Sequence, residues 1–276
     1  MDDFYEIIES IVREESTQAF FEFNKERFAK IFSEKNQDPL ELIENQYKKG
    51  VSLVGIGEDH GMEPGHEFTK NILNPLDKRI GLDFLCLEVE NFLQPKVDKY
   101  LKTGNNKYLE SIINREKELV KKEYPVEGRI KKGYFDIIKE AKDLGISVLF
   151  VDELHSKEII DEDDLERRER IMEKNIPKKG RGMFYCGAFH HPYIKEIREE
   201  KSPNHKFHIL GQIAEENLKG DAEKLLSLSL FPLQYKNSRA INIKEDNELY
   251  NFFKENVLTE GHATKFDSLV YHPKKD

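Results

Sequence analysis

Short apolar runs alternate along most of the chain with longer segments of mixed polarity. The longer segments carry apolar residues at spacings of three and four, the pattern of amphipathic helices. Mainly apolar segments of five to eight residues between them are typical of buried strands, at 51–56, 83–90, 146–151, 182–186, 206–211 and 266–272. This alternation predicts a three-layer α/β/α fold with a mainly parallel sheet.

Two regions lie outside the alternation. Residues 1–49 read as N-terminal helices, one of them beginning at Asp38-Pro39 with Asp38 as the N-cap. Residues 92–142 are highly charged and read as a helical insertion or cap near the cleft, although such runs are usually solvated helix faces. We find no repeat or linker, so the sequence predicts a single α/β domain over residues 1–276.

The composition limits the partners. Charged residues make up 35% of the chain and the net charge is −9, so nucleic-acid binding is not expected. The first residues lack the pattern of a signal peptide, and no apolar run approaches the ~18 residues of a membrane span. Cys86 and Cys186 lie in apolar strands, where a free cysteine behaves as a small hydrophobe. These features favour a cytoplasmic protein.

Ionisable residues follow the apolar runs directly. Glu58 and His60 end the first strand, Glu88 the second and Asp152 the third, and His190 follows the fourth. The carboxyl ends of parallel strands face a common crevice, and charges buried there need partners. Gly-x-x-His occurs twice, ending at His60 and His190, and histidine serves as a base or a metal ligand. The pattern predicts a His/carboxylate cluster, with polar turns as the alternative.

The charged helix predicted at 162–175 contributes one further candidate. Arg168 shares a face with Leu165, Met172 and Asn175, and the apolar members of that face must turn toward the sheet. Arg168 is therefore expected to turn inward and to bond Glu58 or Glu88, while a surface arginine in ion pairs is the alternative. His66, Asp152 and His191 are candidates for substrate binding.

Together these motifs resemble the superfamily of erythromycin esterases, ChaN-like haem-binding lipoproteins and Tiki/TraB metalloproteases. Gly57-Glu-Asp-His60 and Gly187-Ala-Phe-His190 are similar to its two Gly-x-x-His motifs, and Leu87-Glu88 to its second-strand glutamate. The segment 168–175 is similar to the Arg-Asp-x-x-Met-x-x-Asn helix of the esterases, with Glu169 in place of Asp, and 266–270 to a terminal Phe-Asp strand. The resemblance implies a cleft at the strand ends and hydrolytic or metal-dependent chemistry.

The sequence thus favours a soluble hydrolase that cleaves an ester or amide bond in a small molecule or peptide. The residues expected to carry catalysis are Glu58, His60, Glu88, Arg168 and His190. In one version His60 or a glutamate activates water and Arg168 stabilises the oxyanion. In the other, His60, Glu88 and His190 bind a divalent metal such as Zn, Mn or Co.

Two other readings stay open at this stage. A non-catalytic protein of the same fold would bind haem or another small ligand, with Tyr185, His190 and His191 as axial-ligand candidates. A toxin or effector domain would also suit a compact soluble chain, without support from particular residues.

Overall fold

The computed structural model describes residues 34–58, 63–123, 133–153, 162–187, 190–201, 204–214, 238–243, 245 and 266–272. The chain forms two compact units, one made of Ile43–Leu210 and the other of Met1–Leu42 with Gly211–Asp276. The candidate residues that the structure describes all belong to the first of these. The single-domain organisation expected from the sequence stays a prediction.

A parallel sheet organises the unit Ile43–Leu210. Its strands lie in the order β3-β2-β4-β1-β5, and every neighbouring pair is parallel. The bounds are β1 Val51–Glu58, β2 Phe84–Glu90, β3 Ser147–Asp152, β4 Gly182–Gly187 and β5 Lys206–Ala214, of which Lys206–Leu210 fall in this unit. All residues of β2 and β4 are buried, as expected for central strands covered on both faces.

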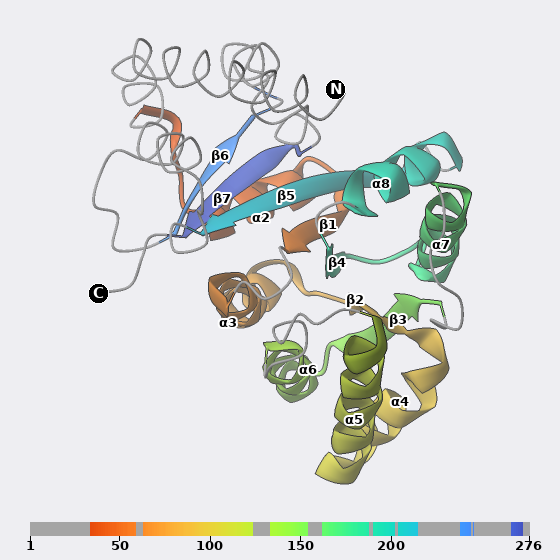
Figure 1. Ribbon diagram of the computed structural model, residues 1–276. Coiled ribbons are helices and arrows are strands. Elements are labelled where there is room, and N and C mark those ends of the chain that lie inside the picture. The colour runs from red at the N-terminus through yellow and green to blue at the C-terminus, as the bar shows by residue number, and fades with distance from the viewer. Residues whose placement is uncertain are drawn as a thin grey trace, which may run out of the picture. The chain divides into compact units, whose positions relative to one another are not determined.

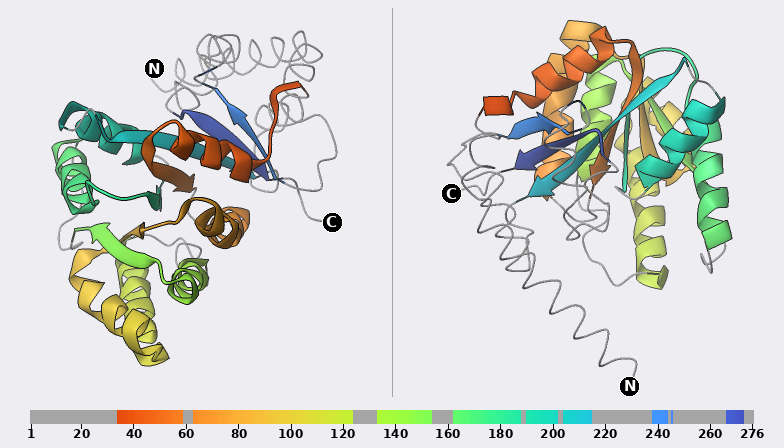
Figure 2. Two further views of the ribbon diagram at one scale, coloured as in Figure 1. Left: turned by 180° about the vertical axis from the view of Figure 1, so that it is seen from behind. Right: turned by 90° about the horizontal axis from the view of Figure 1, so that it is seen from above.

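Helices cover both faces of these strands (Figure 1). On one side lie α3 Glu63–Ile80 and α6 Gly133–Leu144, which pack against each other, and on the other lie α7 Glu162–Asn175 and α8 His190–Lys201. The helices α4 Gln94–Thr103 and α5 Asn106–Glu123 pack as a pair after the short 3₁₀ turn η1 Asn91–Leu93, and α4 contacts β3 (Figure 2). The three-layer α/β/α fold predicted from the sequence is confirmed.

Local sequence features explain several of these elements. The helix α2, Pro39–Lys48, begins where expected, because the Asp38 carboxylate accepts hydrogen bonds from the backbone N–H groups of Leu40 and Glu41. The side chain of Gln94 bonds Val148 and Phe150 of β3 through both its amide atoms, at 2.9 and 2.7 Å. It thereby satisfies backbone groups of an edge strand.

Gly55 in β1 allows α8 to approach the sheet. A Cβ atom at this position would lie 2.4 Å from Nδ1 of His191 and 2.7 Å from the Phe207 ring, closer than atoms pack. The His191 ring also meets Phe184 and Phe207 edge-on. Because α8 begins at His190, this contact fixes the position of the helix start beside the strand ends.

In the second unit, β6 Arg239–Asn242 and β7 Ser268–His272 form an antiparallel pair. Gln37 forms an isolated antiparallel bridge with Ala240. His272 bonds the Ser238 hydroxyl and Gln212, at 2.8 Å each. The strand predicted at 266–272 is thus present, and residues 1–33 of the predicted N-terminal helices lie outside the described residues.

The region 92–142 is helical where it is described, in α4, α5 and part of α6. Among its basic residues, Arg115 pairs with buried Glu90 at the end of β2 and lies over the Phe92 ring. Arg129 and the side chains of Lys121 and Lys122 lie outside the described residues. A capping role for this region stays a prediction.

Candidate functional site

The register of the sheet brings the predicted strand ends to one edge. Glu58, the last residue of β1, pairs with Gly187, the last residue of β4. Leu87 pairs with Tyr185, so Glu88 comes level with the end of β4, and Asp152 pairs with Glu90 on the other side of β2. Parallel pairing alone therefore gathers Glu88, Asp152 and Gly187 at the carboxyl edge.

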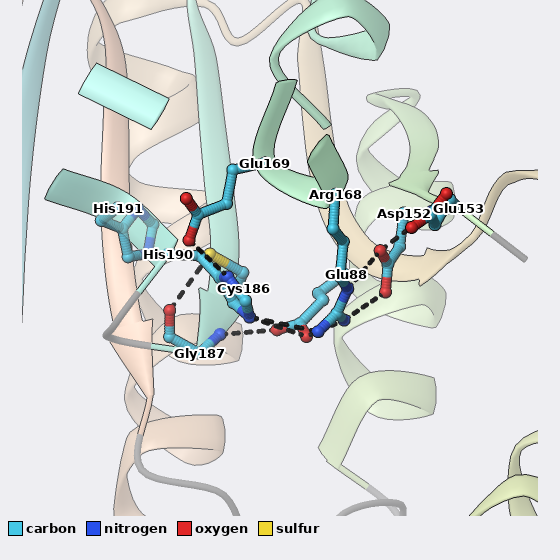
Figure 3. A network of polar contacts seen from close by, with 9 residues as sticks. All are labelled: Glu88, Asp152, Glu153, Arg168, Glu169, Cys186, Gly187, His190 and His191. Carbon is cyan, nitrogen blue, oxygen red and sulfur yellow. Dashed lines mark hydrogen bonds and ion pairs between the residues drawn. The ribbon is translucent and has the colours of Figure 1, made fainter. Parts of the chain in front are cut away.

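Arg168 joins the two carboxylates, as Figure 3 shows. Its Nε donates to Asp152 Oδ1 at 2.9 Å, and its Nη2 donates to Asp152 Oδ2 at 2.5 Å and to Glu88 Oε1 at 2.7 Å. The residue is only 5% exposed, whereas the side chains of its neighbours Arg167 and Arg170 are 45% and 50% exposed. The inward orientation and the bond to Glu88 agree with the helix-face prediction.

The charges in this cluster stabilise one another. Burial by itself lowers the pKa of Arg168, but its bonds and attraction to Asp152 and Glu88 outweigh burial and raise this pKa above its usual value. Glu88 is held on its other side as well, because the Gly187 N–H donates to Glu88 Oε2 at 2.7 Å. Hydrogen bonds thus fix both Arg168 and Glu88 in position.

His190, the first residue of α8, completes the cluster. Its Nδ1 lies 3.1 Å from Glu169 Oε1, and its Nε2 lies 3.5 Å from both Glu88 Oε1 and Arg168 Nη1. Glu169 follows Arg168 directly on α7 and is also buried. We call Glu88, Asp152, Arg168, Glu169 and His190 the Arg168 cluster.

The carboxylates determine the charge of His190. Burial alone would lower its pKa, but the charge of Glu88 and the hydrogen bond to Glu169 raise the pKa of His190 to about 9 against the opposing charge of Arg168. At neutral pH the ring is therefore an imidazolium, with a proton on each nitrogen. Nδ1–H donates to Glu169, and Nε2–H faces Glu88 and Arg168.

Two predicted residues lie at the end of β1. The backbone of Glu58 is described and belongs to the carboxyl edge, but its side chain and all of His60 lie outside the described residues. The roles assigned to Glu58 and His60 stay predictions. The repeat of Gly-x-x-His at β1 and β4 remains the reason to place them with the Arg168 cluster.

The two other histidines named from the sequence occupy different surroundings. His66 on α3 bonds the Tyr185 hydroxyl at 2.8 Å, and Tyr185 faces away from the cluster because successive strand residues point to opposite faces. His191 is 0% exposed, and its Nε2 lies 3.3 Å from Cys186 Sγ. Burial lowers the pKa of His191 to about 4, so this ring is neutral. His191 is a core residue here, and substrate binding by His66 or His191 stays a prediction.

Two groups of this site carry no role in the prediction from the sequence, Glu169 and the Gly187 N–H. Glu169 stands next to Arg168, and that position is the signal by which it could be found. The Gly187 N–H is a backbone group, so its role cannot be recognised from the type of residue. The carboxylate of Asp152 accepts two hydrogen bonds along one edge of the Arg168 guanidinium, from Nε and Nη2, and the substrate-binding role of Asp152 stays a prediction.

Comparison with known proteins gives similarity of fold only. No protein-family model and no curated protein matches the sequence. Among solved structures, a protein from Bacillus cereus aligns with a TM-score of 0.58 at 10% identity, over 91% of this chain and 98% of that one. This alignment supports the α/β/α fold over most of the chain.

Two further structures align less closely. ChaN of Campylobacter jejuni, described with cofacial haem binding, has a TM-score of 0.48 at 13% identity, over 66% of this chain and 88% of ChaN. The C-terminal region of Pasteurella multocida toxin, described with a thiol-protease-like catalytic triad, has a TM-score of 0.40 at 12% identity. That alignment covers 54% of this chain and 20% of the toxin chain. At such identities the similarity does not extend to function.

Within the described residues, no helix combines the length and the apolar character that crossing a bilayer requires.

Proposed function

We propose that this protein is a hydrolase that cleaves an ester or amide bond at the carboxyl edge of the sheet. The observation that carries the proposal is the approach of Arg168 Nη1 and His190 Nε2 to 3.5 Å. With His190 protonated, both nitrogen atoms are donors, so neither accepts from the other. Two donors at this separation suit one shared acceptor, such as the oxygen of a substrate carbonyl.

The remaining contacts of the cluster fit this role. Asp152 and Glu88 hold the guanidinium through three hydrogen bonds, and Glu169 holds the imidazolium at Nδ1. Donors fixed in advance stabilise an oxyanion more effectively than donors that must reorganise during the reaction. The contacts of His190 Nε2 are 3.5 Å long, against 3.1 Å from Nδ1 to Glu169, so the proton on Nε2 is held less tightly and is the better suited to transfer to a substrate.

The proposed reaction conserves its protons. Water adds to the carbonyl carbon while a base removes one of its protons, and the negative oxygen that forms is held by Arg168 and His190. The intermediate then loses its alcohol or amine as the bond to carbon breaks, and His190 Nε2 donates a proton to the departing atom. His190 recovers a proton from the base, which returns the cluster to its starting state.

The base is assigned from the sequence. Glu88 is a weak candidate, because each of its oxygens already accepts a hydrogen bond, one from Arg168 and the other from Gly187. We therefore assign the base to His60, which follows the end of β1 by two residues. Substitution of His60 by Ala is expected to abolish turnover and to leave the melting temperature close to that of the parent.

A metal-assisted version fits the described residues poorly. A divalent ion bound to Glu88 and His190 would lie beside the Arg168 guanidinium, which is 3.5 Å from His190 Nε2 and repels cations. His190 would also have to lose the proton that Glu88 and Glu169 stabilise. His60, the third ligand of the predicted set, lies outside the described residues, so the metal set of His60, Glu88 and His190 stays a prediction.

The haem alternative is also not favoured by the described contacts. Tyr185 and His191, two of the three axial-ligand candidates, are completely buried. Tyr185 bonds His66, and His191 bonds Cys186, so neither side chain is presented to a ligand. His190 alone borders the strand-end site.

The test is a screen of p-nitrophenyl esters and aminoacyl amides with purified protein, followed by two variants. Arg168→Lys and His190→Gln are each expected to lower kcat by about 10²–10³, the usual effect of losing one oxyanion donor. Arg170→Lys is the matched control, because Arg170 lies on the same helix and is half exposed. Its kcat should equal that of the parent.

Two outcomes would overturn the proposal. One is hydrolysis that survives unchanged in both Arg168→Lys and His190→Gln. The other is a folded parent protein that turns over none of the esters or amides but shows a saturable haem absorption band lost in His190→Ala, which would favour the binding protein.

A further inference from the structure

A second group of charged residues lies away from the Arg168 cluster, where α7 and α8 pack together. It consists of Glu173 on α7, Lys178 before β4, Arg198 and Lys201 on α8, and His205 before β5, and we call it the Glu173 cluster. Lys178 and His205 precede their strands, so this cluster lies toward the edge where β4 and β5 begin.

The cluster has more positive than negative charge. Glu173 is 2% exposed and receives Lys178 in a direct ion pair, while Arg198 Nη1 and Lys201 Nζ each lie 3.9 Å from its oxygens. One carboxylate thus faces three cations among the described residues. Although Lys178 contacts Glu173, burial and the charges of Arg198 and Lys201 lower the pKa of Lys178 to about 8.

Arg198 is the least satisfied member. It is 1% exposed, and its Nη2 donates to the Pro177 carbonyl at 2.6 Å. Its Nε and Nη1 are buried without a hydrogen-bond partner among the described residues, and so is Nδ1 of His205. A buried arginine left with two unsatisfied donors is costly, so the arrangement lacks an acceptor.

We infer that the Glu173 cluster binds a small oxyanion of the phosphate class. Such an ion carries the acceptor oxygens that Arg198 Nε and Nη1 lack, and its negative charge would balance the excess of cations around Glu173. The side chains of Lys178 and Lys201 are 40% and 50% exposed, so the cluster extends from a buried guanidinium to ammonium groups at the surface.

An anion bound in the Glu173 cluster would connect α7 with α8. Glu173 lies one helical turn beyond Glu169 on α7, and Arg198 lies two turns beyond His190 on α8. An anion shared by residues of both helices would tie together the two elements that hold the proposed catalytic groups. The anion site is argued from the Glu173 cluster itself and does not depend on the proposed hydrolysis.

The test measures binding of inorganic phosphate to the full chain by calorimetry and by thermal shift, with sodium chloride holding the ionic strength constant. Saturable binding and a rise in melting temperature are expected. Lys201→Gln should weaken phosphate binding about tenfold, because it removes a charge that faces the ion. Lys174→Gln removes an exposed charge next to Glu173 and should leave binding unchanged.

The variants separate binding from general salt effects. Phosphate stabilises many proteins by exclusion from their surface, and such stabilisation would not saturate and would be equal in Lys201→Gln and Lys174→Gln. That result, or no saturable binding by the parent, would overturn the inference. Binding of glycerol phosphate shows whether the cluster takes a free ion or the phosphate group of a larger molecule. Binding as tight as that of inorganic phosphate indicates the phosphate group of a larger molecule, and weaker binding indicates the free ion. Loss of ester turnover would not bear on this result.

Discussion

Replacement of Arg168 by Lys tests the central feature of the candidate site. The guanidinium makes three charge-assisted hydrogen bonds, two to Asp152 and one to Glu88. Both carboxylates are 1% exposed and depend on this partner for their charge. A lysine keeps the positive charge but presents a point charge in place of the planar fork, and so cannot reproduce all three bonds.

The size of the effect follows from the bonds lost. An ammonium that stays with Asp152 loses about two bonds to charged groups, each contributing ~1.5–3 kcal/mol, and partial repacking recovers some of this. We expect a loss of about 3 kcal/mol in the free energy of unfolding. For a chain of this size that corresponds to a fall of about 6–12 °C in melting temperature.

The assay is chemical and thermal unfolding of Arg168→Lys beside Arg170→Lys. Arg170 pairs with Glu166 on the exposed face of α7, where such pairs contribute about 0–1 kcal/mol, so the control should melt within about 2 °C of the parent. Equal melting temperatures for the two variants would refute the buried, bridging position of Arg168. Turnover is compared at 20 °C, where both variants should be folded.

Three further outcomes are expected. Glu169→Gln should lower the pKa of His190, so the fall of kcat with rising pH moves from near 9 toward neutral, while Glu166→Gln leaves the pH profile unchanged. Because the pKa of His190 is raised to about 9, this residue contributes about 3 kcal/mol to the free energy of unfolding below pH 6.5, and the contribution is lost as the pH rises through 9. The pKa of His191 is lowered to about 4, so the free energy of unfolding falls as the pH drops from 6.5 toward 4. Unfolding measured from pH 4 to pH 10 should therefore show a maximum near pH 6.5, and a flat profile would contradict both assignments. Gly55→Ala should destabilise the protein by about 1–3 kcal/mol in thermal melts, because the new methyl group overlaps His191, and an unchanged melting temperature would show that α8 is not packed against β1 as described.

The fold was predictable because its signals are local. Buried parallel strands require continuous apolar runs, and β2 and β4 are buried along their whole length. The position of Arg168 was predictable for a similar reason, since helical periodicity places it on the same face as Met172, which is fully buried. The direction of one long side chain therefore followed from the apolar neighbour whose face it shares.

The partners within the site were decided by the tertiary structure. No spacing in the sequence indicates that Asp152 and Glu88 share one guanidinium, because that depends on β3 lying beside β2 and on α7 packing against β3. Whether His190 is charged also depends on distance, since burial alone would lower its pKa and only the approach of Glu88 and Glu169 reverses the direction.

The two adjacent histidines show most clearly which properties the sequence determines and which the packed structure determines. His190 and His191 are identical in chemistry and consecutive in sequence, and the sequence placed both at the strand end. The start of α8 turns the first toward Glu169 and the second into the space left by Gly55. One ring is held as a cation by carboxylates and the other is kept neutral by burial, because the local dielectric and the nearest charges are properties of the packed structure. The sequence determined which residues stand at the edge of the sheet, and the packing of α7 and α8 determined their charges.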